Sequence, residues 1–292
     1  MYISLSGQLG SGKSTLCAYL EKNYGFETFS TGTIHRRLAK ERNLSTLEFN
    51  KLIAGDKNVD LLIDDEMKKF ARENTSRDII FDSRLAWHFI GGSFKVFLLV
   101  SPKRAAHRVF FGRVLDEEKY STKEEALREL IHRRDLETRR FKDFYGVDCN
   151  DYNNYDFIID TSEISTEEIA EAIFKAYDCF INNRFYIKCF VSPKNVYPLE
   201  KISEESKENT DMISLIKIEN GLFIYRGKGK VIEAIKNGEK TVGAKIVFSD
   251  DEKYSEDFTA ASFVERSLSM DCIAAWEREN NFDFGYYPDF LI

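Results

Sequence analysis

One short motif near the start of the chain constrains the fold more than any other feature. Residues 7–14 read Gly-Gln-Leu-Gly-Ser-Gly-Lys-Ser, an uninterrupted G-x-x-x-x-G-K-S pattern. The motif directly follows the apolar run Tyr2–Leu5 and precedes the helix-compatible run Thr15–Leu20. A glycine loop between a strand and a helix binds phosphate, because its backbone N–H groups curl around the phosphate oxygens and the helix directs the positive end of its dipole at them.

Two residues of this loop have specific chemical roles in such motifs. Lys13 is placed to reach the β- and γ-phosphates of a nucleotide, and Ser14 to supply a hydroxyl to Mg²⁺. A tight turn that carries glycine and lysine by chance is the alternative. The flanking strand and helix argue against it.

Length and composition narrow the class of protein. A chain of 292 residues predicts one large or two modest domains, and 43% apolar residues suffice for a sizeable core. We expect no signal peptide and no membrane span, because no long apolar run is present. Five scattered cysteines without a C-x-x-C pair fit reduced thiols in the cytoplasm. The net charge of −7 predicts no nucleic-acid partner, and the oligomeric state stays open.

Strands and helices alternate over the first 180 residues or so, which predicts a parallel sheet covered by helices on both faces. We expect this three-layer α/β/α domain to comprise residues 1–183. The predicted strands are Tyr2–Ser6, Thr28–Ser30, Asp78–Asp82, Lys95–Val100 and Asp156–Asp160, and the predicted helices are Ser14–Tyr24, Thr33–Glu41, Val59–Glu73, Lys103–Phe111, Lys123–Phe144 and Thr166–Phe180 (the last with Ser165 as cap and Glu168 three residues on).

The pattern changes near residue 185, and residues 184–292 are predicted to form a small α+β domain. Asn220-Gly221 between two apolar runs is a hairpin signal. The aromatic end Phe282–Pro288 is expected to pack on the same chain rather than on another subunit. The predicted elements here are strands Phe185–Val191, Met212–Glu219, Leu222–Arg226 and Lys245–Phe248, a polar loop over Glu200–Asp211, and a helix over Phe263–Arg278.

Further charged residues follow at spacings that suggest a site. Asp82 ends an apolar strand and can either orient water on Mg²⁺ or cap a helix. Arg133, Glu137 and Arg140 share one helix face and can clamp a phosphoryl group, although spacing alone favours a solvated, salt-bridged face. Arg108 and Arg113 can flank ATP, although spacing alone favours the surface for both.

Residues 1 to about 180 resemble cytidylate kinases, particularly the compact archaeal-type branch of the nucleoside monophosphate kinases. The most specific blocks are Tyr145-Gly146-Val147-Asp148 and Tyr155-Asp156 with Ile159-Asp160-Thr161-Ser162. Other blocks in the same order are Gly7–Thr15, Ser30-Thr31-Gly32 with Ile34 and Arg36, Asp64 with Met67, Arg84-Leu85-Ala86, Glu124–Leu127 and Arg133/Glu137/Arg140.

The resemblance implies ATP-dependent phosphorylation of CMP or dCMP by a core that holds Mg²⁺ and ATP, an acceptor region and a closing lid. The implied ATP-binding residues are Gly7, Gly10, Ser11, Gly12, Lys13, Ser14 and Thr15. The residues themselves add Arg108 and Arg113 as ATP-binding candidates and Ser14 with Asp82 as the candidate metal site. The implied acceptor residues are Ser30, Gly32, Arg36, Asp64, Arg84 and Glu137, and the implied catalytic residues are Lys13 and the lid arginines Arg133 and Arg140.

Two departures from the family pattern bear on the acceptor. Asp82-Ser83 stands where Glu-Gly is common, and Asp65 stands where arginine often follows the aspartate. An acidic residue facing the pocket would weaken attraction for an anionic acceptor. A P-loop kinase of another small metabolite, or a nucleotide-binding regulator with a C-terminal partner-binding module, therefore remain alternatives. The three residues at lid spacing, Arg133, Glu137 and Arg140, favour an enzyme.

Overall fold

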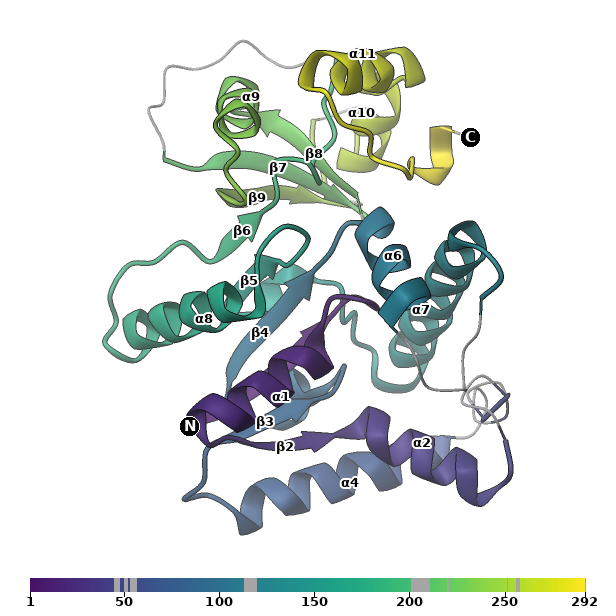
Figure 1. Ribbon diagram of the computed structural model, residues 1–292, viewed down its shortest axis with the longest axis vertical. Coiled ribbons are helices and arrows are strands. Elements are labelled where there is room, and N and C mark those ends of the chain that lie inside the picture. The colour runs from purple at the N-terminus through teal and green to yellow at the C-terminus, as the bar shows by residue number, and fades with distance from the viewer. Residues whose placement is uncertain are drawn as a thin grey trace.

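One continuous sheet organises the molecule. The computed structural model describes residues 1–44, 48–49, 52, 57–112, 120–200, 211–219, 221–250, 252–255 and 258–291. Within these residues the sheet has nine strands in the order β2-β3-β1-β4-β5-β6-β9-β7-β8 (Figure 1). The strands are β1 Tyr2–Gly7, β2 Glu27–Ser30, β3 Ile79–Asp82, β4 Phe94–Leu99, β5 Phe157–Asp160, β6 Cys189–Val191, β7 Ile213–Ile218, β8 Gly221–Arg226 and β9 Val242–Ser249.

The direction of the strands changes at β6. The neighbours from β2 to β6 run parallel, whereas β6 pairs with β9 and β7 pairs with β8 in antiparallel fashion. The described helices are α1 Lys13–Tyr24, α2 Thr31–Glu41, α4 Lys57–Glu73, α5 Ala86–Phe89, α6 Pro102–Gly112, α7 Lys123–Tyr145, α8 Thr166–Ile181, α9 Lys228–Asn237, α10 Ala260–Ser267 and α11 Met270–Asn280.

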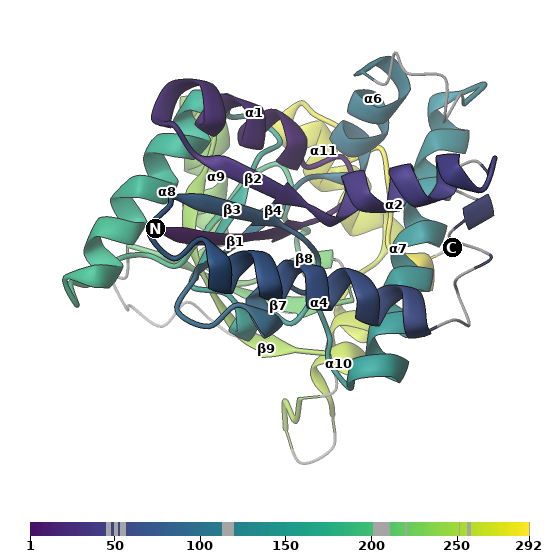
Figure 2. The same cartoon turned by 90° about the horizontal axis from the view of Figure 1, so that it is seen from below.

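The parallel part of the sheet lies between two helix layers, as predicted. Helices α1 and α4 lie on opposite sides of strands β1 to β3 (Figure 2). Ile3 and Leu5 of β1 pack in one core with α1 and α8, whereas Ile79 and Phe81 of β3 pack on the α4 side. Strands buried on both faces read as apolar runs, which is why the sequence reveals them. The predicted elements of residues 1–180 are confirmed to within two residues, and Ser165 and Glu168 form a capping box at α8.

Two predicted elements of the C-terminal region (residues 184–292) were wrong in extent. Pairing of β6 begins at Cys189, so the preceding residues of the predicted strand Phe185–Val191 are not in the sheet. The predicted helix Phe263–Arg278 is two helices, because the backbone at Leu268 is extended and Ser269 starts α11 by accepting a hydrogen bond from the Cys272 N–H. Helix α9, which lies between two left-handed glycines, was not predicted.

The remaining predictions for this region are largely confirmed. Strands β7 and β8 pair as the predicted hairpin, and Asn220 and residues 201–210 of the predicted loop lie outside the described residues. Phe284 is buried and stacks on Tyr197 with ring centroids 4.4 Å apart, so the aromatic end packs on its own chain. The sheet and the largest apolar core continue across residue 184; that core joins Phe97 to Phe223.

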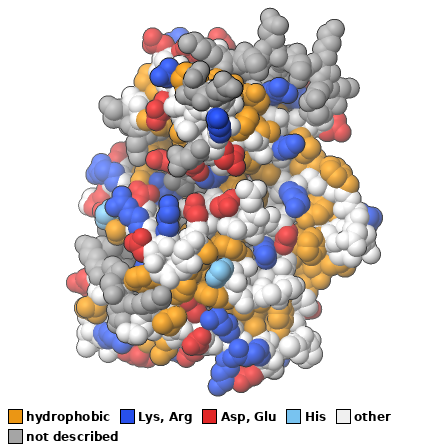
Figure 3. Space-filling view, turned by 180° about the vertical axis from the view of Figure 1, so that it is seen from behind, with side chains coloured by type: hydrophobic (Ala, Val, Ile, Leu, Met, Phe, Trp, Pro, Cys, Tyr) orange, Lys and Arg blue, Asp and Glu red, His pale blue; other side chains and the backbone are white. Residues whose placement is uncertain are grey.

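Charges of both signs are spread over the surface. On the face opposite to that of Figure 1, blue and red side chains are interspersed with hydrophobic ones, so the residues coloured there form no broad field of one sign (Figure 3). Among the described helices, none combines the length and apolar character needed to cross a bilayer.

Candidate functional site

The phosphate loop (residues 7–14) adopts a conformation that its glycines make possible. Gly7, Gly10 and Gly12 have φ of +148°, +77° and +90°. A Cβ atom on Gly7 would lie 2.6 Å from the Leu98 carbonyl oxygen, and one on Gly10 would lie 2.9 Å from the Ala105 Cα. Both the torsions and the close packing therefore require glycine. The loop passes directly into α1, whose first residue is Lys13.

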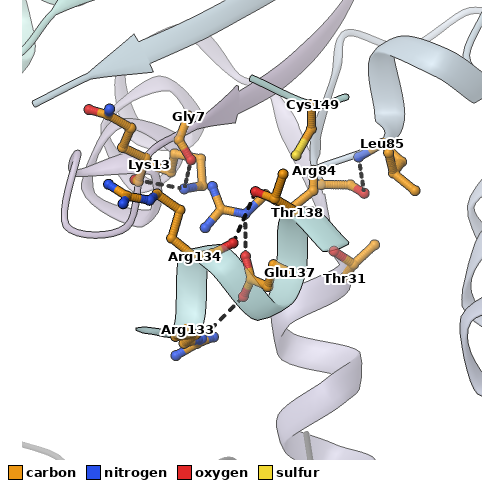
Figure 4. A network of polar contacts seen from close by, with 12 residues as sticks. Gly7, Lys13, Thr31, Arg84, Leu85, Arg133, Arg134, Glu137, Thr138 and Cys149 are labelled. Carbon is orange, nitrogen blue, oxygen red and sulfur yellow. Dashed lines mark hydrogen bonds and ion pairs between the residues drawn. The ribbon is translucent and has the colours of Figure 1, made fainter. Parts of the chain in front are cut away.

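Lys13 lies inside this loop. Its Nζ donates to the carbonyl oxygens of Gly7 at 3.1 Å and Gln8 at 3.4 Å (Figure 4). Burial, together with the nearby positive charge of Arg84, lowers the pKa of Lys13 to about 7. An anion bound in the loop would stabilise the charged ammonium and raise this pKa again. An anion in the loop would therefore bind together with the protonated form of Lys13.

Arg108 of α6 forms a hydrogen bond with the phosphate loop. Its Nη1 donates to the Gly10 carbonyl oxygen at 3.3 Å and to the Thr161 hydroxyl at 3.0 Å, and its Nη2 donates to the Thr161 carbonyl oxygen. The surface position that spacing favoured for Arg108 is therefore wrong. The reason is tertiary, because α6 packs against the phosphate loop at Gly10. Arg113 lies outside the described residues.

A polar cleft opens beside Lys13. It brings together most of the predicted site residues from β3, α1, α2, α4 and α7. Ser30 lies next to this group, because its hydroxyl donates to the Asp82 carboxylate at 3.1 Å. The lining residues are Leu9, Lys13, Ser14, Thr31, Gly32, His35, Arg36, Asp60, Ile63, Asp64, Asp82, Ser83, Arg84, Leu85, Arg133, Glu137, Arg140, Phe141 and Tyr145.

Glu137 holds two arginines at the wall of the cleft (Figure 4). Its carboxylate accepts from Arg84 Nε at 3.0 Å and from Arg133 Nε at 3.1 Å. Burial acts to raise the pKa of Glu137, but Arg84, Arg133 and Arg140 outweigh it and lower this pKa to about 2. The Glu137 side chain is 18% exposed and that of Arg84 is 19% exposed. The helix face is salt-bridged, as spacing alone favoured, but its side chains are largely buried and not solvated.

Arg140 faces acidic residues of α4. Its Nε lies 3.5 Å from the Asp60 carboxylate, and these side chains are 12% and 6% exposed. One turn further along α4, Asp64 accepts a short hydrogen bond from the Tyr145 hydroxyl. Burial raises the pKa of Asp64 to about 6, although the bond from Tyr145 acts in the opposite direction. This part of the cleft therefore contains a carboxyl group that titrates near neutral pH.

The sequence-based reasoning missed several residues of this wall, among them Asp60, His35 and Tyr145. Asp60 stands four residues before Asp64, and that spacing on one helix face was an available signal. His35 follows the predicted Ser-Thr-Gly block and lines the cleft. Burial, aided by the charge of Arg140, lowers the pKa of His35 to about 4, so the imidazole is neutral at physiological pH. No periodic pattern distinguishes such a histidine.

The acceptor-side residues predicted on α2 lie at its first turns. Ser30 caps α2 by accepting a hydrogen bond from the Thr33 N–H at 3.4 Å. Gly32 lines the cleft, and a Cβ placed there would lie 3.6 Å from Arg36 Nη1. Arg36 Nη2 donates to the Thr33 hydroxyl at 3.1 Å. The start of this helix therefore brings a guanidinium to the mouth of the cleft.

The two departures from the family pattern have different surroundings. Asp65 is 74% exposed, pairs with Lys68 and is not among the residues that line the cleft. Ser83 is buried in the cleft wall, and its hydroxyl accepts from the Leu85 N–H at 3.3 Å. The acidic side chain at position 65 therefore does not face an anion in the cleft.

Ser14 and Asp82 both line the cleft on the side of the phosphate loop. A hydroxyl and a carboxylate are oxygen donors of the kind that Mg²⁺ prefers. Asp82 accepts the Ser30 hydroxyl hydrogen bond, and it does not cap α5, whose N-cap residue is Leu85. These residues fit a nucleotide-bound magnesium ion.

Comparisons with known proteins match the amino-terminal part of the chain. The Cytidylate kinase-like family matches residues 2–163. A cytidylate kinase of Methanosarcina mazei is 36% identical over 183 residues, which cover 62% of this chain and 98% of that protein. An S-adenosylmethionine-dependent nucleotide dehydratase of Lacinutrix mariniflava is 36% identical over 178 residues, which cover 60% of this chain and 35% of that protein.

Among solved structures, shikimate kinase from Acinetobacter baumannii in complex with shikimate aligns with a TM-score of 0.38 and 16% identity. The alignment covers 63% of this chain and 95% of that one.

Proposed function

Because this chain belongs to the cytidylate kinase-like family, we propose that it transfers the γ-phosphoryl group of ATP to a pyrimidine nucleoside monophosphate, CMP or dCMP. This proposal rests on one observation: the phosphate loop and the arginine-bearing wall line the same cleft. Lys13 of the phosphate loop and the Arg84–Glu137–Arg133 group line one cavity. A triphosphate held by the loop would thus face guanidiniums contributed by α7.

Cationic side chains from separate elements are available to anionic ligands in the cleft, which Asp60, Asp64, Asp82 and Glu137 also line. The cleft wall carries Lys13 and the guanidiniums of Arg36, Arg84, Arg133 and Arg140. Arginine binds phosphate with planar, paired N–H donors. In our proposal Arg36 and Arg84 hold the phosphate of the acceptor, while Arg133 and Arg140 stabilise the phosphoryl group in flight. Glu137 keeps Arg84 and Arg133 at a fixed separation and therefore preorganises both sites.

The remaining wall suits the uncharged part of the acceptor. His35, Asp64 and Tyr145 offer an imidazole, a carboxyl and a phenol at one end of the cleft. These groups can accept and donate hydrogen bonds to a ribose or a base. We propose that Asp64 contacts the acceptor in its ionised form, because a carboxylate accepts hydrogen bonds from base or sugar donors.

The reaction needs little covalent chemistry from the protein. An acceptor phosphate is already nucleophilic near neutral pH, so positioning and charge stabilisation do the work. Ser14 and Asp82 would hold Mg²⁺, which neutralises charge on the triphosphate oxygens when bound. We propose that α7 closes with its arginines over the phosphates and excludes water, which would otherwise hydrolyse ATP.

The test is an acceptor panel. Purified protein is incubated with Mg·ATP and each of CMP, dCMP, UMP, AMP, GMP and dTMP, and ADP formation is compared with an ATP-only control. We expect turnover with the pyrimidine monophosphates, CMP and dCMP first. ATP binding without turnover of any acceptor would contradict the proposal and favour a nucleotide-binding regulator. Turnover confined to purine acceptors would contradict the assigned substrate.

A further inference from the structure

A fully buried carboxylate joins the phosphate-binding half of the molecule to the C-terminal region. Asp160 ends β5 and has no exposed surface. Its Oδ1 accepts from the Ser162 N–H at 2.9 Å and from the Ser162 hydroxyl. Its Oδ2 accepts from the Ser192 N–H at 3.2 Å and from the Asn195 amide at 2.7 Å. The last two donors follow β6, beyond residue 163, where the match to the family ends.

The next residue along the chain contacts the phosphate loop. The Thr161 hydroxyl lies 2.9 Å from the Ser11 carbonyl oxygen and equally 2.9 Å from the Leu99 carbonyl oxygen, so these two acceptors share its single proton, and it accepts from Arg108 Nη1 at 3.0 Å. Arg108 Nη1 also donates to the Gly10 carbonyl oxygen at 3.3 Å. Thr161 thus contacts the Ser11 carbonyl group directly. It contacts the Gly10 carbonyl group indirectly, through Arg108. The orientation of these two carbonyl groups decides where the neighbouring N–H groups point.

These contacts form one short chain from the C-terminal region to the nucleotide site. The Asn195 amide fixes Asp160, the adjacent Thr161 fixes Ser11, and Arg108 extends the contact to Gly10. A buried carboxylate depends on all its donors, because no water replaces a missing one at no cost. Loss of the Asn195 amide would leave Oδ2 with the Ser192 N–H and would let residues 160–161 shift. That shift would displace the Ser11 and Gly10 carbonyl groups of the phosphate loop.

We infer that Asn195 is a positioning residue for nucleotide binding: it acts through Asp160 and Thr161 to hold the phosphate loop in its binding conformation. This inference rests on the proposed use of the loop for ATP. It gives the C-terminal region a role that the family's shared segment cannot supply. Asn195 itself reaches the loop through other residues and does not touch the reacting atoms.

The experiment compares ATP binding by the full chain and two variants, using isothermal titration calorimetry. Asn195→Ala should raise the Kd for ATP by about three- to tenfold, which is the range of one ordinary hydrogen bond. The matched control is Lys240→Ala. Lys240 also joins the C-terminal region to the first part, through Glu168 of α8 at 2.6 Å, but both side chains of this pair are exposed and, within the described part of the chain, neither forms a hydrogen bond with the phosphate loop. Its Kd should stay within about twofold of the wild type.

A double-mutant cycle separates this role from a general loss of stability. Thr161→Val removes the hydroxyl that contacts Ser11 while it keeps the side-chain shape. If Asn195 acts through this turn, the variant with both substitutions should bind ATP no more weakly than Thr161→Val alone. Additive losses, or an Asn195→Ala protein whose Kd matches that of the wild type, would overturn the inference. Where Asn195→Ala does not fold, Asn195→Ser replaces it in the same cycle.

Steady-state kinetics give a second reading. Asn195→Ala should raise the KM for ATP and leave the KM for the acceptor unchanged, whereas a loosened fold would weaken both. Because ATP binding is measured without turnover, failure of the proposed reaction is distinguishable. If the wild type bound ATP but phosphorylated no acceptor, the proposed function would be wrong. The double-mutant cycle of ATP binding would still test the role of Asn195.

Discussion

Both parts of this molecule bury apolar cores, but the amino-terminal part also gathers charged side chains around a cleft. The amino-terminal part places ionised groups at low exposure around one cleft, among them Asp60, Glu137 and Arg140. The C-terminal region buries mainly aliphatic and aromatic side chains such as Phe223 and Trp276. Desolvated charges cost free energy, whereas buried apolar groups stabilise the fold. On this difference we base our proposal that the cleft carries the chemistry and that the C-terminal region supports it.

The largest effect should follow loss of the loop cation. Lys13→Ala should lower kcat by about a thousandfold, because the charge facing the transferred group disappears. The fold should remain, since the Lys13 amine contacts two loop carbonyls and no apolar core. ADP formation and thermal unfolding measure the two effects. Lys22→Ala, at an exposed position of the same helix, is the control and should behave like the wild type. Full activity in Lys13→Ala would remove the phosphate loop from the mechanism.

Next in size is the loss of an arginine from α7. Arg140→Ala should lower kcat by about a hundredfold while the Kd for ATP changes little, because we assign this guanidinium to the transition state. Arg139→Ala serves as the matched control, because the adjacent side chain is exposed. Equal losses in kcat and in ATP affinity would place Arg140 in ground-state binding instead.

The C-terminal region should show the converse behaviour. Phe284→Ala should lower the free energy of unfolding by about 3 kcal/mol, because it leaves a hole beside Tyr197. Turnover of the folded protein should change far less than in the cleft variants. Urea unfolding and ADP formation provide the readouts. Phe290→Ala, at a side chain that is 37% exposed, should destabilise less. If Phe284→Ala lowered kcat as much as Arg140→Ala, the assignment of catalysis to the cleft and of stability to the C-terminal region would be contradicted.

The smallest expected effect is a change in pH dependence. The pKa of Asp64 is about 6, so its carboxyl group gains a proton as the pH falls through that value. If the ionised form contacts the acceptor, the KM for the acceptor should rise as the pH is lowered from 7 to 5. Asp64→Asn should lose the part of the profile that belongs to this group, while titration of the acceptor phosphate affects both proteins alike. Identical profiles for wild type and variant would exclude the assigned contact.

The helices, the strands and the phosphate loop could be predicted from the sequence, because the patterns that form them span only a few neighbouring residues. The G-x-x-x-x-G-K-S motif and the helical spacing of Arg133, Glu137 and Arg140 are both local patterns. Local patterns also placed Ser165 as a cap, but the break at Leu268 was missed because Ser269 resembles any polar helix residue.

The contacts that assemble the site come from distant parts of the chain. Arg84 meets Glu137 across 53 positions, and Asp160 meets Asn195 because β5 and β6 are neighbours in the sheet. The periodic pattern of apolar residues cannot predict which distant residues pair with each other. The resemblance to a family placed Arg84 and Glu137 on the acceptor side without predicting their contact, and the second contact involves a segment that the family match does not include.

Phosphorus-31 NMR of a single reaction mixture tests the central claim most directly. Wild-type protein, Mg·ATP and CMP are combined, and the resonances of ATP, ADP, CMP, CDP and inorganic phosphate are followed over time. The account predicts that CDP and ADP appear together in equal amounts, with no matching rise in inorganic phosphate. ADP accompanied by inorganic phosphate while CMP stays intact would contradict it, because the cleft would then hydrolyse ATP without passing the phosphoryl group to an acceptor.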